Sequence, residues 1–129
     1  MDILIPIDGT DASKRALDFA IEMAVRMGAT PYVVHFTNKQ TDATEAILED
    51  ARERLSAANF PNKPALSTIT VDIWTADRVG KEILETVEKN DYDHVVMGHH
   101  ESGTVERAVF GSAAETVLRD ESVPMTVVP

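Results

Sequence analysis

The chain alternates strand-like and helix-like hydrophobic patterns over its whole length of 129 residues. Short runs rich in β-branched residues predict strands, and apolar residues that recur every three or four positions predict helices. The predicted strands span residues 3–7, 31–36, 67–74, 94–97 and 125–128. The order βαβαβαβαβ predicts an α/β fold with an open five-stranded parallel sheet and helices on both faces.

Four amphipathic segments fill the intervals between these strands. Gly28 is expected to end the first helix, and Thr10 or Asp11 to cap its start. Asp77 is expected to cap the third helix, and Pro61 and Pro64 to break the chain after the second. The expected inward stripes are Ala16, Leu17, Ala20, Met23, Ala24 and Met27; Ile47, Ala51 and Leu55; Val79, Ile83, Leu84 and Val87; and Ala113, Ala114, Val117 and Leu118.

Composition narrows the function classes. The formal net charge is −10, with 22 acidic against 12 basic residues, so no basic patch stands out to bind nucleic acid. The chain has no cysteine, which excludes disulfides and thiolate chemistry. No apolar run is long enough to span a membrane, and no signal peptide is evident. We therefore expect one cytoplasmic domain over residues 1–129.

The most suggestive local feature is the long polar loop that separates Gly98, at the end of a strand, from Gly111 and Ser112, at the start of a helix. Long loops in compact domains are uncommon and usually functional. Backbone N–H groups at a helix start favour anions, so this loop predicts a phosphate site. A structural explanation is also open: Gly98 can serve a positive φ, and Gly111 close helix packing.

Other polar residues carry weaker signals. Asp8 ends the first strand, where its carboxylate can accept hydrogen bonds from ribose hydroxyls or serve turn chemistry with Gly9. His99 and His100 are adjacent, and no further ligand cluster accompanies them, so no metal site is expected. We expect His35 to be a hydrogen-bonded core residue.

Catalytic motifs are missing. The sequence has no P-loop, no dinucleotide-binding fingerprint after the first strand and no nucleophile elbow. No nucleophile is arranged with a base and an orienting group. We therefore expect a binding protein and, at most, a slow ATPase.

With these motifs in view, the chain resembles the small single-domain universal stress proteins along essentially its whole length. The opening strand and its Asp-Gly-Thr turn carry part of the likeness, and the last helix and strand carry another part. The residues concerned are Ile3–Thr10, Val34–Phe36, Asp93–Gly98, Gly111–Leu118 and Val123–Val128.

The resemblance implies a Rossmann-like sheet of order 3-2-1-4-5, related to the adenine nucleotide alpha hydrolases. It also implies a homodimer through the C-terminal strand, a stress-response role with an unidentified protein partner, and an ATP site that magnesium could share. In that site Asp8 would contact the ribose, and Phe36 the adenine. The residues expected around the nucleotide are Pro6, Ile7, Asp8, Phe36, Met97, Gly98, Gly111, Ser112 and Ala113.

One position departs from the ATP-binding pattern of that family, which is Gly, two residues, Gly, nine residues, then Gly followed by Ser or Thr. Gly98, Gly111 and Ser112 fit, whereas Glu101 replaces the middle glycine. Two unit charges about 5 Å apart interact by about 3 kcal/mol at an effective dielectric of about 20, so Glu101 would repel phosphate. Magnesium could reverse that sign. The alternative is a nucleotide-free dimeric interaction module of the same family.

Overall fold

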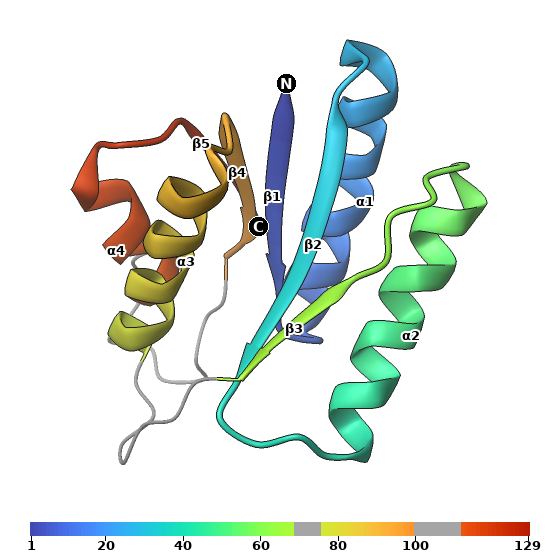
Figure 1. Ribbon diagram of the computed structural model, residues 1–129, viewed down its shortest axis with the longest axis horizontal. Coiled ribbons are helices and arrows are strands. Elements are labelled where there is room, and N and C mark those ends of the chain that lie inside the picture. The colour runs from blue at the N-terminus through green and yellow to red at the C-terminus, as the bar shows by residue number, and fades with distance from the viewer. Residues whose placement is uncertain (69–75, 100–111) are drawn as a thin grey trace.

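The computed structural model describes residues 1–68, 76–99 and 112–129 (Figure 1). Strands and helices alternate along these residues, as the hydrophobic patterns predict. The elements are β1 (Asp2–Ile7), α1 (Asp11–Met27), β2 (Thr30–Thr37), α2 (Asp42–Ala57), β3 (Ala65–Thr68), α3 (Ala76–Asn90), β4 (His94–Gly98), α4 (Ser112–Asp120) and β5 (Met125–Val128).

All five strands are parallel and lie in the order β3-β2-β1-β4-β5, which confirms the predicted topology. Asp2 to Ile7 of β1 pair with Thr30 to His35 of β2, and Ile3 and Leu4 pair with His94 and Val95 of β4. The strand order reverses at β1, because β2 lies on one side of it and β4 on the other. In open α/β sheets, ligands bind beyond the carboxyl ends of the strands at such a switch point.

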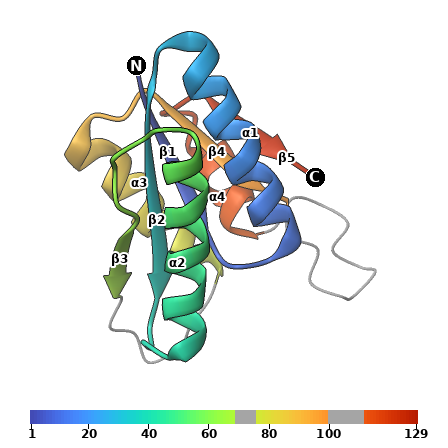
Figure 2. The same ribbon diagram turned by 90° about the vertical axis from the view of Figure 1, so that its right-hand side faces the viewer.

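Two apolar cores lie on opposite faces of the sheet. Helices α1 and α2 cover one face, and α3 and α4 cover the other (Figures 1 and 2). The alternation of side chains along β1 explains this division, since Ile3, Ile5 and Ile7 belong to the first core and Leu4 to the second. β1 is therefore buried on both faces, as its apolar sequence predicts.

The predicted inward stripes are confirmed, apart from particular residues at helix ends. Leu118 and Met27 are 44% and 55% exposed, because each lies in the last turn of its helix, beyond the packed face. The third strand begins at Ala65, two residues before the expected start, and residues 69–74 lie outside the described part of the chain. Asp77 does not precede α3, because the helix already includes Ala76.

The ends of α1 follow the sequence signals closely. Thr10 is the N-cap, and its side chain accepts a hydrogen bond from the amide of Ser13. Gly28 ends the helix in the left-handed conformation that a C-terminal glycine favours. Among the described helices, none is long and apolar enough to cross a membrane.

Candidate functional site

The candidate site lies where β1 and β4 end side by side. β1 ends at Ile7 and is followed by Asp8, Gly9 and the N-cap Thr10, while β4 ends at Gly98. If the register of Ile3 with His94 is carried forward at the same offset, Ile7 lies level with Gly98. The topology therefore brings Asp8 and Gly98, which are 90 positions apart in the sequence, to the same edge of the sheet.

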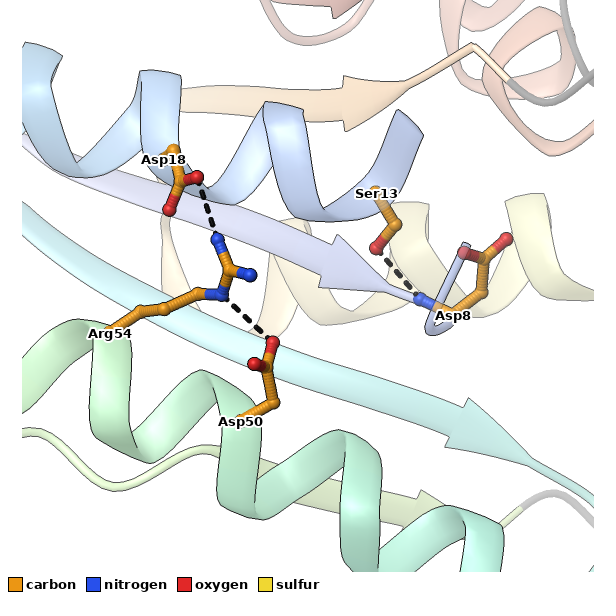
Figure 3. Close-up of polar contacts among 5 residues, drawn as sticks. All are labelled: Asp8, Ser13, Asp18, Asp50 and Arg54. Carbon is orange, nitrogen blue, oxygen red and sulfur yellow. Dashed lines mark hydrogen bonds and ion pairs between the residues drawn. The ribbon is translucent and has the colours of Figure 1, made fainter. Parts of the chain in front are cut away.

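Asp8 is held by a closed set of hydrogen bonds with the first turn of α1. Its amide donates to Ser13 Oγ (3.0 Å), and the amide of Ser13 donates to Thr10 Oγ1 (3.2 Å). The Thr10 hydroxyl (2.6 Å) and amide (3.0 Å) both donate to Asp8 Oδ1. Ser13 is buried and points toward the Asp8 amide, whereas the Asp8 carboxylate is exposed (Figure 3).

Gly98 is required by the packing of β4 against the start of α1. A Cβ atom placed on Gly98 would lie 2.6–2.7 Å from backbone atoms of Ala12 and Ser13. Gly98 does not have a positive φ, so close approach explains this glycine and conformational freedom does not. The same contact seats the Asp8–Ser13 turn directly against the end of β4.

A cavity of about 360 Å³ opens on the other side of this turn, between α1 and α2. Gly9 lines it with a φ of +82°, and a Cβ atom there would lie 2.8 Å from the side chain of Ile47. Lys14 and Asp50 supply charge, and Ile7, Leu17 and Ile47 supply apolar surface. Asp8 and Ser13 also line this cavity, so the turn that carries Asp8 borders both the β1–β4 edge and the recess between α1 and α2.

The predicted adenine-site residues divide between the two faces of the sheet. Phe36 and Met97 are buried in the core beneath α3 and α4, whereas the side chain of Ile7 belongs to the core beneath α1 and α2. Pro6 is buried in β1, and strand alternation places it on the same face as Leu4. The side chain of Ile7 thus lies on the opposite face of the sheet from Phe36 and Met97.

His35 is a buried and satisfied histidine, as the sequence predicts. Its Nδ1 lies 2.7 Å from the carbonyl oxygen of Ile7. Because a carbonyl accepts hydrogen bonds, Nδ1 carries the proton in this contact. The contact ties the ends of β1 and β2 together just before Asp8.

Helix α4 begins at the same edge of the sheet. Ser112 is its first residue, as expected, and Ala113 packs against the core beneath α3 and α4. Gly111, Glu101 and His100 lie outside the described residues. Within the described ranges, no group of three or more His, Cys, Asp or Glu side chains could hold a metal ion.

Comparison with known proteins identifies the family. The model of the universal stress protein family matches residues 1–129. The chain belongs to the universal stress protein family. Universal stress protein MJ0531 of Methanocaldococcus jannaschii is 32% identical over 136 aligned positions, which cover 98% of this chain and 80% of that protein.

Solved universal stress proteins share the fold. One in complex with cAMP has a TM-score of 0.78 at 21% identity and covers 99% of this chain and 95% of its own. One from Archaeoglobus fulgidus in complex with dAMP has a TM-score of 0.74 at 21% identity, with 100% and 98% coverage. At this identity the likeness establishes the Rossmann-like α/β architecture.

The sequence interpretation missed one residue of this edge, Ser13. The signal was present, because Ser13 stands three positions after the N-cap Thr10, at a spacing that allows reciprocal side-chain and backbone contacts. A serine at that position is easily interpreted as an ordinary helix residue with no specific contact. Its partner is the amide of Asp8, which only the folded turn brings within reach.

Proposed function

We propose that this universal stress protein binds an adenine nucleotide, ATP, at the edge between β1 and β4. The observation that carries the proposal is the Asp8 carboxylate, which is fixed by Thr10 and exposed beside Gly98 at the switch point. Carboxyl ends of parallel strands at such a point are the usual place for nucleotides in open α/β sheets. The cAMP and dAMP complexes of similarly folded family members support the choice of an adenine nucleotide.

Within this proposal each predicted residue keeps the role that the family resemblance implies. Asp8 accepts a hydrogen bond from the ribose, and Phe36 and Met97 form apolar surface near the adenine. Pro6 and Ile7 border the adenosine, Ile7 through its backbone. The triphosphate, with or without magnesium, is expected to contact Gly98, Gly111, Ser112 and Ala113.

The output that we propose is association and not turnover. β5 is an edge strand, and all four of its residues are half-buried, so one side of its backbone is available for pairing with a second copy of the chain. Nucleotide occupancy at the end of β4 would alter the neighbouring β5 and hence the dimer or a partner contact. We further propose that the protein acts in the cytoplasm as a nucleotide-dependent stress-response factor.

Titration calorimetry with ATP, with and without magnesium, tests the binding step. We expect saturable heat with the wild-type chain and a large loss of affinity in Asp8→Asn, which keeps an oxygen for Thr10 but turns an amide toward the ligand. Gly98→Val is a poorer choice, because its side chain would collide with the backbone of α1. Flat heat at millimolar ATP, with no nucleotide released on denaturation, would contradict the proposal.

The alternative of a nucleotide-free interaction module rests on Glu101, which stands where ATP-binding family members carry glycine. Glu101→Gly removes a negative charge from the expected phosphate segment, so we expect tighter ATP binding in this variant. Weaker binding that also loses its magnesium dependence would instead assign Glu101 to the metal. Equal absence of binding in both proteins would favour the interaction module.

A further inference from the structure

The hydrogen bonds around Asp8 leave its two carboxylate oxygens in different states. A carboxylate offers about four acceptor positions, two on each oxygen. The amide and the hydroxyl of Thr10 fill both positions on Oδ1. Oδ2 accepts no hydrogen bond from any described residue, and Asp8 is exposed.

The backbone beneath this carboxylate is also fixed. The amide of Asp8 donates to the hydroxyl of Ser13, which is 4% exposed in the first turn of α1. The amide of Ser13 in turn donates to the hydroxyl of Thr10 that holds Oδ1. Rotation of the Asp8 side chain would break the 2.6 Å hydrogen bond that the Thr10 hydroxyl donates to Oδ1, and with it the bond from the Thr10 amide.

We propose that Thr10 and Ser13 are positioning residues that present a single oxygen of Asp8, Oδ2, and so make the site select one ribose hydroxyl. This inference rests on the proposed function, since it specifies how the ATP site reads the sugar. A freely rotating carboxylate can accept from both vicinal hydroxyls of a ribose. A carboxylate with Oδ1 already saturated accepts well from one of them.

The selectivity follows from the cost of an unmade bond to a charged acceptor. Removal of the hydroxyl that faces Oδ2 is expected to weaken binding about tenfold or more, because hydrogen bonds to charged groups are among the stronger ones. Removal of the other hydroxyl leaves Asp8 unaffected. Affinities for ATP, 2′-deoxy-ATP and 3′-deoxy-ATP therefore report the orientation of the carboxylate.

The experiment compares these three nucleotides by calorimetry on the wild-type chain and on Thr10→Val. In the wild type, one deoxy analogue binds about tenfold or more weakly than ATP, while the other stays within about twofold. Thr10→Val removes the hydroxyl and leaves only the backbone amide on Oδ1, so Oδ1 regains a free acceptor position and the two analogues become equivalent. Thr10→Ser restores the hydroxyl and the difference between them.

Two further variants separate positioning from general stability. Thr44→Val makes the same change at the start of α2, where the buried Thr44 hydroxyl accepts from the amide of Thr41, and we expect it to keep the wild-type selectivity. If Thr10→Val does not fold, Thr10→Ala takes its place, since it removes the same hydroxyl with a smaller side chain and leaves Asp8 unchanged. Selectivity is then expected to disappear.

The outcomes distinguish this inference from the function on which it rests. A wild-type chain that binds all three nucleotides equally overturns the positioning role and leaves ATP binding intact. Selectivity that survives in Thr10→Val, or in Thr10→Ala, also overturns it. A wild-type chain that binds none of the three overturns both proposals.

Discussion

Helices α1 and α2 cover the same face of the sheet but are attached to it very differently. α1 buries seven residues, and four of them are alanines spaced one turn apart, at positions 12, 16, 20 and 24. α2 buries three residues: Thr44 at its start, and Ala51 and Leu55 in its second half. α1 reaches four strands, whereas α2 lies over β2 and touches α1.

This difference in burial indicates that α1 is held firmly against the sheet, whereas α2 can shift more easily. Small side chains let α1 lie close to the sheet, and its first turn carries the Thr10–Ser13 contacts that hold Asp8. The cavity of about 360 Å³ lies between α1 and the first half of α2. Binding groups on firmly packed elements keep their geometry best, so the candidate site is built from the α1 side.

The largest expected effect comes from the same substitution in both helices. Leu17→Ala in α1 and Leu55→Ala in α2 each remove a fully buried side chain, and such changes cost about 2–5 kcal/mol. We expect Leu17→Ala to cost about 4 kcal/mol, because the anchored α1 cannot collapse into the gap. We expect about 2 kcal/mol for Leu55→Ala, because α2 can shift inward.

Urea unfolding of both variants measures this difference, and hydrogen exchange locates it. Leu55→Ala should speed exchange mainly in α2, while Leu17→Ala should speed it throughout the sheet. Equal free-energy losses, or a larger loss for Leu55→Ala, would show that α2 is held as firmly as α1.

A smaller effect is expected where α1 meets β4. Gly98→Ala places a methyl group against the backbone of Ala12 and Ser13, which cannot rotate away, so we expect a cost of about 3 kcal/mol. Gly28→Ala at the other end of α1 is the matched control, because nothing lies within 4 Å of the added atom. Gly28→Ala should cost about 1 kcal/mol of stability, because position 28 has a left-handed φ. Similar melting temperatures for the two variants would mean that the first turn of α1 shifts away from β4 at little cost in stability.

The same contrast explains how far the sequence could predict the fold. Hydrophobic periodicity identified every element, because buried parallel strands and amphipathic helices are local patterns. The strand order followed from the family resemblance. Periodicity could not show that α1 is packed more tightly than α2, since both helices carry an apolar stripe. The close approach of Gly98 to α1 depends on atoms about 85 residues apart in the sequence and has no local signature.

For the candidate site, the sequence identified residue types more readily than their relations. Asp8 and Gly98 were expected at the ends of strands, and the sheet places both at one edge. Their expected contacts with a nucleotide remain predictions. The assignment of Ile7 to one face and of Phe36 to the other follows from strand alternation and register together. The position of Ser13 three residues after Thr10 was visible in the sequence, but its bond to the amide of Asp8 was not, because only the folded turn brings the two together.

The smallest expected effect concerns the polar link between the two helices. Arg54 of α2 reaches Asp18 of α1 (2.6 Å) and Asp50 of its own helix (2.8 Å), and the hydrogen bond to Asp18 raises the pKa of Arg54 (Figure 3). Because all three side chains are partly solvated, Arg54→Gln should cost less than about 1 kcal/mol.

Arg52→Gln is the matched control for this link, since Arg52 pairs with Glu49 inside α2 and forms no ion pair with α1 among the described residues. We expect Arg54→Gln to be the more destabilising variant by a few tenths of a kcal/mol. The difference should vanish in about 1 M salt, where the screening length falls to about 3 Å. If it persists there, the stem of Arg54 stabilises α2 by packing, and α2 is less adaptable than its three buried residues indicate.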